Sequence, residues 1–269
     1  MEVVLTRCTL ETTGGLLVYE VVGEGDPVLF LAPRGYDRRV WSDVAVLLAP
    51  GIRSVMPDER GFGESGDALG VVDPVRDVSA VMDACGGERF FVVAADASAD
   101  VALALALDRA SSLRGVLLIN PSLRELVSPR SPWYLEAAGE RAVTNLAAMA
   151  VAGSSTEAFI TRLKQAGATG EPEVWERLEA IMETMRRRVE RLPERRVTPT
   201  VYLELGRITV PAVVATVHPA GEEASPVERA IADAIPSARF VEVESSWTTM
   251  LGLGEPARCA ALVRELVSG

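Results

Sequence analysis

Short apolar runs alternate along the chain with longer segments of helical periodicity. The runs are rich in Val, Leu and Phe and end at turn residues, as buried strands do. They are Val3–Leu5, Leu16–Val22, Val28–Ala32, Arg53–Met56, Phe90–Ala94, Val116–Ile119, Ala212–Val217 and Phe240–Val243. Helical patterns lie between them at Val75–Cys85, Ser98–Arg109, Pro226–Ala234 and Pro256–Val267. The alternation predicts an α/β fold, a mostly parallel sheet with helices on both faces.

Two segments modify this picture. Thr12–Gly15 joins the first two runs like a hairpin turn, which predicts antiparallel strands at one edge of the sheet. Residues 122–207 contain no convincing strand and several helical patterns, of which Glu173–Leu192 is one. We therefore expect a core formed by residues 1–121 and 208–269, with residues 122–207 inserted as a helical cap.

Composition narrows the function classes. The chain has 269 residues, 48% of them hydrophobic, which is enough for a substantial core. A net charge of −11 repels phosphate backbones, so nucleic acid is not an expected partner. Three scattered cysteines do not form a disulfide framework or a zinc cluster. No secretory signal and no apolar run of about 18 residues is present, which predicts a cytoplasmic protein without a membrane partner.

The number of histidines restricts the possible chemistry most. His218 is the only histidine, which excludes sites that hold a metal with several imidazoles. It also limits every imidazole-based mechanism to what position 218 can reach. No metal, nucleotide or flavin motif is visible, so no cofactor is expected.

Several motifs carry a family resemblance. Gly23–Leu31 leads into a loop that ends at Trp41, and Asp58–Ser65 reads D-x-R-G-x-G-x-S. Ile208–Pro211, Ile235–Ala238 and Glu255-Pro256 stand before later elements. Together these segments resemble the α/β-hydrolase superfamily over essentially the whole chain. The resemblance implies an eight-stranded sheet, a helical cap, a small-molecule substrate and a monomer or homodimer.

In this superfamily the nucleophile lies on a sharp turn between a strand and a helix. The corresponding segment is Ala94–Asp100, with either Asp96 or Ser98 at its apex. The turn needs small flanking residues, and those of Asp96 are Ala94 and Ser98. Asp also tolerates the positive φ of such a turn. We therefore place Asp96 at the nucleophile position, as in epoxide hydrolases and haloalkane dehalogenases. The alternative is that Asp96 only caps the following helix.

The imidazole that the superfamily uses is missing from its expected place. A catalytic histidine would follow the last strand, where Ser246 and Trp247 stand instead. His218 follows the preceding strand, near the position of the superfamily's acid, and reaches the site only if that loop is rebuilt. Asn120, Glu222 and Glu223 are further candidates for the acid position.

The oxyanion loop also departs from the pattern. The superfamily's His-Gly is replaced by Ala32-Pro33-Arg34-Gly35, although backbone N–H groups of Arg34 and Ala97 could still stabilise an oxyanion. The Arg34 side chain could pair with Asp96, hold a substrate carboxylate or point to solvent. Ala97 replaces the halide-binding Trp of dehalogenases, which argues against dehalogenation. The other residues expected to line the site are Ala32, Ser98, Asn120, Trp133, Tyr134, Tyr202, His218, Ser246 and Trp247.

Without a histidine, an ester formed on Asp96 has no evident base to hydrolyse it. A carboxylate in a dry pocket can instead transfer protons near neutral pH. The first hypothesis is therefore elimination, isomerisation, cyclisation or dehydration of a small, largely apolar molecule by Asp96 with Arg34, in natural-product biosynthesis. The alternatives are an epoxide hydrolase-like enzyme that uses Asp96 and His218, and a non-catalytic ligand-binding protein.

Overall fold

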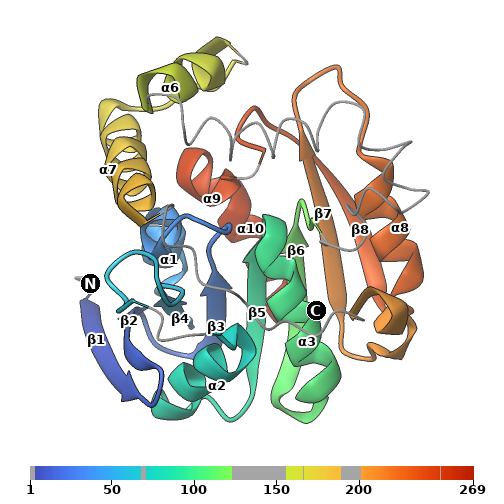
Figure 1. The fold of residues 1–269 in the computed structure, drawn as a ribbon. Coiled ribbons are helices and arrows are strands. Elements are labelled where there is room, and N and C mark those ends of the chain that lie inside the picture. The colour runs from blue at the N-terminus through green and yellow to red at the C-terminus, as the bar shows by residue number, and fades with distance from the viewer. Residues whose placement is uncertain (1–3, 68–70, 123–155, 166, 189–200, 249) are drawn as a thin grey trace.

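A computed structural model describes residues 4–67, 71–122, 156–165, 167–188, 201–248 and 250–269 (Figure 1). Eight strands form one sheet in the order β1-β2-β4-β3-β5-β6-β7-β8. The β2–β1 and β2–β4 pairs are antiparallel, and the remaining pairs are parallel. The strands are β1 (Leu5–Thr12), β2 (Gly15–Val22), β3 (Asp26–Leu31), β4 (Ile52–Pro57), β5 (Phe90–Ala95), β6 (Leu113–Ile119), β7 (Ala212–His218) and β8 (Ala238–Glu244).

The sheet confirms the predicted fold class and the predicted edge hairpin. The first strand differs, because the apolar run Val3–Leu5 ends where β1 begins. β1 pairs with β2 from Leu5 to Thr12, and its inward side chains include Cys8 and Leu10. Polar residues occupy most of the outward positions on this edge strand, so hydrophobicity alone does not reveal it.

Helices cover both faces of the sheet, and the strand residues alternate between the two cores they form. One core lies under α2 (Pro74–Ala84), α3 (Ala99–Asp108) and α8 (Pro226–Ala234). The other lies under α1 (Ser42–Leu48) and α10 (Pro256–Ser268). In β5, for example, Val92 and Ala94 face the first core, and Val93 and Ala95 face the second. By the same alternation, the side chain of residue 96 would face the first core if β5 continued beyond Ala95.

The segment between β6 and β7 contributes helices that extend beyond the sheet. Its described elements are α6 (Thr156–Gln165), α7 (Pro172–Arg188) and the 3₁₀ helix η5 (Val201–Arg207). Figure 1 shows α7 beyond α1, with α6 farther out. α7 and the short α9 (Leu251–Gly254) share a third apolar cluster that includes Leu178, Met182 and Leu253. The sequence pattern indicates neither α1 nor α9.

The D-x-R-G-x-G-x-S motif holds the antiparallel edge to the parallel strands. Ser65 Oγ donates to the Asp58 carbonyl at 2.8 Å and accepts from the Val18 N–H at 2.9 Å. Arg60 forms two hydrogen bonds to the Asp77 carboxylate, of 2.8 and 3.0 Å. The residues that carry the family resemblance here therefore build the scaffold.

A buried ion network lies beside this motif. Arg38 pairs with Asp58 and Glu64 and lies 2.7 Å from Glu20, and its side chain is only 6% exposed. Gly63 has φ of 50°, and a Cβ there would overlap the Asp58 carboxylate. The motif therefore requires Gly at this position for both conformation and space.

Candidate active site

Asp96 lies at the apex of the turn between β5 and α3. It begins the short 3₁₀ helix η2 (Asp96–Ser98) and has φ of 54°. Positive φ is uncommon for residues other than glycine, and Asp is among those that tolerate it best. The neighbouring Ala94 and Ala95 are fully buried in the strand, which leaves no room for larger side chains. The structure thus gives Asp96 the strained turn geometry that the sequence predicted.

The loop after β3 runs alongside this turn. Leu31 of β3 is paired with Ala94 of β5, so the residues that follow each strand meet at the same edge. Ser98 Oγ donates a 2.6 Å hydrogen bond to the Ala32 carbonyl and fastens the loop to the elbow. Ser98 is therefore a buried link between two loops, not the residue at the apex.

A tight turn directs the next residues of that loop. The Tyr36 N–H donates to the Pro33 carbonyl at 3.0 Å, and Gly35 has φ of 95°. These features are typical of a turn that needs glycine at its third position. The turn contains Arg34, whose charge favours the ionised form of Asp96 and lowers its pKa, and it ends at Tyr36, whose pKa is raised by the charge of Asp96.

Burial dominates the ionisation of Asp96 and raises its pKa. The Ala97 N–H, the Ser122 hydroxyl and the Arg34 charge oppose this effect, because each favours the carboxylate. The Ser122 Oγ donates to Asp96 Oδ1 at 2.9 Å, and the Ser122 N–H donates to the Asp96 carbonyl at 3.2 Å. Burial also raises the pKa of Tyr36, and the negative charge of Asp96 adds to the rise. Tyr36 therefore stays protonated and can donate a hydrogen bond.

Ala97, one of the two predicted oxyanion donors, follows Asp96 directly in η2. Its N–H favours the ionised form of the Asp96 carboxylate and so opposes the effect of burial on the pKa of Asp96.

The structure does not join His218 to Asp96. His218 ends β7 and is 5% exposed, and its Nδ1 lies 3.2 Å from the Pro219 carbonyl. Its Nε2 is buried and has no hydrogen-bond partner within the described residues. β6 separates β7 from β5 in the sheet, which keeps His218 two strands from the elbow.

Asn120 has a bridging role. It has φ of 43° at the end of β6, and its side-chain oxygen accepts from the Val217 N–H. Its Nδ2 donates to the carbonyls of Val217 at 2.8 Å and Thr248 at 3.2 Å. The amide thus ties β6, β7 and the loop after β8 together and is already occupied by backbone groups.

Trp247 fills the region after β8 where the resemblance places a histidine. Its side chain is 2% exposed, and its indole N–H donates to the Thr169 carbonyl at 2.9 Å. Its ring lies 5.0 Å from that of Trp175 in α7. Ser246 lies close to Gly167, because a Cβ added to this glycine would be 3.2 Å from the Ser246 Oγ. Trp247 and Ser246 therefore both lie against the segment between β6 and β7.

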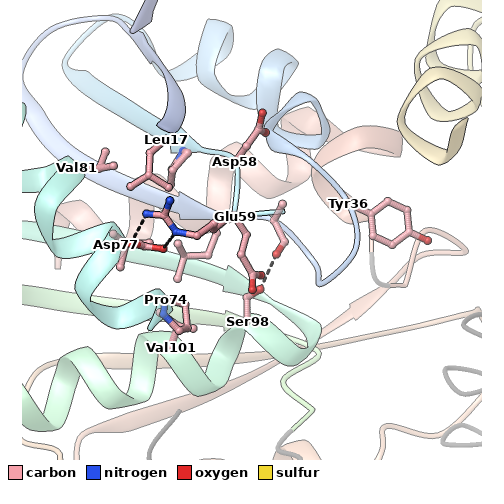
Figure 2. A pocket seen from close by; sticks show the side chains of 14 residues that line it. Leu17, Tyr36, Asp58, Glu59, Pro74, Asp77, Val81, Ser98 and Val101 are labelled. Carbon is pink, nitrogen blue, oxygen red and sulfur yellow. Dashed lines mark hydrogen bonds and ion pairs between the residues drawn. The ribbon is translucent and has the colours of Figure 1, made fainter. Parts of the chain in front are cut away.

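A small cavity opens behind the elbow, between the end of β4, α2 and the start of α3. Its volume is about 30 Å³, which is room for water but not for an organic substrate. Ala32, Tyr36 and Ser98 line it together with the Arg60–Asp77 pair. Figure 2 shows Glu59 extending toward Ser98, with Tyr36 at the far side. The cavity therefore borders the loop after β3 but is too small to be the substrate site.

Three predicted lining residues are not placed by these observations. Trp133 and Tyr134 lie outside the described residues. Tyr202 belongs to η5, but its side chain is outside the description.

Among the residues that the structure describes, no group of three or more His, Cys, Asp or Glu side chains could hold a metal ion. Within the same residues, no helix is long and apolar enough to cross a membrane.

Two residues around Asp96 escaped the sequence reasoning. Tyr36 ends the same turn that contains Arg34, and Ser122 lies just past the end of β6. The signal for Ser122 was its place after the strand that neighbours β5, because the carboxyl ends of parallel strands meet at one edge. Tyr36 had no comparable signal, since its orientation depends on the turn at Gly35.

Comparison with known proteins agrees with this architecture. A family model described as the alpha/beta hydrolase family matches residues 28–262. The chain belongs to this family. A haloalkane dehalogenase 2 of Mycobacterium tuberculosis is 28% identical over 114 residues, which are 41% of this chain and 40% of that protein. A haloalkane dehalogenase of Bradyrhizobium diazoefficiens is 29% identical over 125 residues, covering 45% and 39%. The matches thus span about two fifths of these relatives.

Solved structures share the fold over almost the whole chain. A thermophilic esterase from Thermogutta terrifontis has a TM-score of 0.66 at 22% identity and covers 98% of both chains. An enol-lactonase from Burkholderia xenovorans has a TM-score of 0.69 at 21% identity, with coverage of 97% and 100%. At these identities the likeness concerns the fold alone.

Proposed function

We propose that this hydrolase-fold protein is an enzyme in which Asp96 transfers a proton on a small, largely apolar molecule. The reaction classes are elimination, isomerisation, cyclisation and dehydration, with residues 122–207 as the cap over the site. One observation carries the proposal. The buried Asp96 has the elbow geometry of a reacting residue, yet its side-chain hydrogen bond comes from the Ser122 hydroxyl.

The surroundings of Asp96 suit proton transfer. A general acid or base works best when its pKa lies near the operating pH, and burial moves that of Asp96 upward. The strained φ of 54° is a cost that a helix cap alone does not require. Both features support a chemical role over simple capping of α3.

The geometry disfavours hydrolysis through an ester on Asp96. Such an ester needs a base that activates water, and His218 is directed at its own neighbouring carbonyl. Asn120 is likewise engaged with backbone groups. A hydrolase that uses Asp96 with His218 would have to rearrange the end of β7.

Packing around Trp247 favours a second candidate, a ligand-binding protein without catalysis. Trp247, Trp175, Leu178 and Met250 form an apolar cluster between the α6–α7 segment and the loop after β8. An aromatic cluster in place of the histidine would serve a protein that retains a pocket and has lost turnover. The two candidates differ in whether a bound compound is converted.

The decisive variant is Asp96→Asn, because Asn also tolerates positive φ and keeps the backbone geometry. The wild type and this variant are incubated with a panel of small apolar metabolites, and products are detected by mass spectrometry. We expect conversion of at least one compound, with a loss of roughly 10²- to 10⁴-fold in the variant. Asp83→Asn, at an exposed side chain on α2, is the matched control and keeps full activity.

Three outcomes separate the candidates. Full activity of Asp96→Asn removes the aspartate from the mechanism. Binding of a compound that neither protein converts identifies a ligand-binding protein. Single turnover in H₂¹⁸O tests for an ester, because its hydrolysis would leave ¹⁸O in the Asp96 peptide; we expect no such label.

A further inference from the structure

We infer that a second copy of this chain docks on the outer edge of β1 as an antiparallel strand. Thr9 lies at the two-fold axis of the pair, and the sheets of the two copies become continuous. The inference concerns assembly and does not depend on the reaction at Asp96.

The strand β1 ends the sheet and offers a free edge. Its neighbour in the sheet is β2, and within the described residues no strand pairs with its other side (Figure 1). Its eight residues pair with β2 without a register shift, and none of them is proline. The side chains on its inner face, which include Cys8 and Leu10, are uncharged. Bulges, prolines and inward-pointing charges are the features that keep edge strands from pairing, and β1 has none of them.

The hairpin register shows which backbone groups point outward. Thr12 and Gly15 close a two-residue turn, so their N–H and C=O groups bond each other. Because this pattern alternates along the strand, Leu5, Arg7, Thr9 and Glu11 direct their N–H and C=O groups away from β2. The side chains of the same four residues are exposed. Pairing of the copies around Thr9 gives about six new backbone hydrogen bonds.

The charges on this edge complement themselves. Arg7 and Glu11 lie two residues on either side of Thr9, so a two-fold axis at Thr9 places each Arg7 opposite the Glu11 of the other copy. Opposite charges at such positions stabilise a strand pair, and like charges destabilise it. An axis at Arg7 or at Glu11 would instead place like charges opposite each other. The charge pattern therefore selects the register centred on Thr9.

Both charged side chains are available for this contact. Arg7 donates from Nε and Nη2 to Glu64, at 3.2 Å each, and its side chain is still 48% exposed. Its Nη1 remains for a second carboxylate. Glu11 is exposed, and no ion pair joins it to another described residue.

Exposed apolar side chains lie at the start of the same strand. Val4 is 69% exposed and Leu5 is 47% exposed. In the register centred on Thr9, they lie opposite Gly14 and Thr13 in the hairpin turn of the second copy. Pairing therefore covers apolar surface at both ends of the interface, which favours association.

The other sheet edge, β8, lacks this complementarity. Arg239 faces one side of β8, whereas Glu242 and Glu244 face the other, because side chains alternate along a strand. Two antiparallel copies place side chains of the same face opposite each other, so no such register pairs Arg239 with either glutamate. Arg239 and Glu242 already pair within the copy, with Glu265 and Arg229 respectively, at 2.7 Å each. We therefore assign the contact to β1.

The first test measures association by sedimentation equilibrium over a wide range of protein concentrations. A single strand pair buries less area than a standard interface, so we expect a weak, reversible monomer–dimer equilibrium. Physiological ionic strength screens the general repulsion between copies of net charge −11. Arg7→Glu or Glu11→Arg puts like charges opposite each other at both symmetry-related positions. Each should raise the dimer Kd by roughly tenfold, and the double variant should restore it.

The direction of the Glu11→Arg effect is diagnostic. This substitution makes the net charge less negative, so general repulsion alone would predict a tighter dimer, whereas the β1 register predicts a weaker one. Arg239→Glu and Glu242→Arg make the same charge changes on β8 and are the matched controls. Neither should change the dimer Kd.

The second test locates the two-fold axis by cross-linking. Cys8→Ser/Thr9→Cys places one thiol at the expected axis, where opposite Cα atoms are about 5.5 Å apart. A short bismaleimide should join two copies there, as a dimer band on a denaturing gel. Cys8→Ser/Thr13→Cys carries its thiol on the exposed hairpin turn, at opposite ends of the paired strands. This control should give no cross-linked dimer.

The outcomes decide the inference in either direction. Loss of the dimer in both single charge variants and its recovery in the double variant support it, because a second charge change does not repair a misfolded strand. A wild type that stays monomeric at every concentration overturns it. A dimer that ignores both single substitutions, or that cross-links equally well through Thr13→Cys, uses another surface and overturns it too.

Discussion

The Ser122 hydroxyl donates a 2.9 Å hydrogen bond to Oδ1 of Asp96. Ser122 follows β6, the strand beside β5, whereas the superfamily's imidazole comes from the loop after the last strand. A serine hydroxyl can orient a carboxylate and favour its ionised form, but it does not act as a base that regenerates a covalent ester. This one pairing moves the expected chemistry from hydrolysis toward proton transfer.

Ser122→Ala should raise the pKa of Asp96 further. The hydroxyl stabilises the carboxylate, and its removal leaves burial less opposed. NMR titration of ¹³C-labelled aspartate carboxyls measures the shift. Ser111→Ala, on the surface turn before β6, is the control. An unchanged titration of Asp96 in Ser122→Ala would show that this hydrogen bond does not form in solution.

Asp96→Asn should change how stability depends on pH. The pKa of Asp96 is raised above its ordinary value of 3.8, so the native state binds the proton more strongly than the unfolded chain. The contribution of Asp96 is therefore most favourable below that value and is lost as pH rises through the native pKa. We expect the free energy of unfolding of wild type relative to Asp96→Asn to fall as pH rises above about 4, and to level off once pH exceeds the native pKa of Asp96. Urea unfolding at several pH values measures it, and a constant difference contradicts the raised pKa.

Asp96→Ala separates charge from backbone strain. Alanine removes the same charge but tolerates positive φ poorly, at a cost of roughly 1–2 kcal/mol. We therefore expect Asp96→Ala to be less stable than Asp96→Asn by about this amount at neutral pH. Equal stability of the two variants would mean that the elbow relaxes to a negative φ.

Arg38→Met should be strongly destabilising. The buried guanidinium pairs with Asp58, Glu20 and Glu64, and its removal leaves carboxylates buried without their cation. Breaking a buried pair in this way costs about 3–5 kcal/mol. Arg239→Met disrupts the exposed pair with Glu265 and should cost at most about 1 kcal/mol. Urea unfolding measures both, and similar small losses would show that the network contributes little.

Gly63→Ala tests the scaffold role of the D-x-R-G-x-G-x-S motif. The new Cβ would overlap the Asp58 carboxylate and also meet a positive φ. Gly86 has φ of 66°, and a Cβ added there would meet nothing within 4 Å, so Gly86→Ala carries only the backbone cost of about 1–2 kcal/mol. We expect Gly63→Ala to lower the thermal unfolding midpoint clearly more than Gly86→Ala. Equal shifts would mean that Asp58 moves aside at no cost.

Most of the fold could be predicted from the sequence, because parallel strands that are buried on both faces have continuous apolar sequences. β7 and α8 begin where the pattern predicted, and α8 matches it at both ends. The first strand was predicted too early in the chain, because only one face of β1 is buried and its apolar residues are not continuous. α1 and α9 are short, and their positions depend on contacts with Trp41 and Trp247 more than on periodicity.

The sequence by itself determined the family architecture, the elbow at Asp96 and the lack of a histidine in the expected loop. These features depend on local residue order, such as small neighbours around a strained turn. Only the tertiary structure decided which groups meet the carboxylate. Ser122 reaches Asp96 from the end of the neighbouring strand β6, through the register of β5 and β6. Such contacts are set by the packing of distant segments, which no local pattern records.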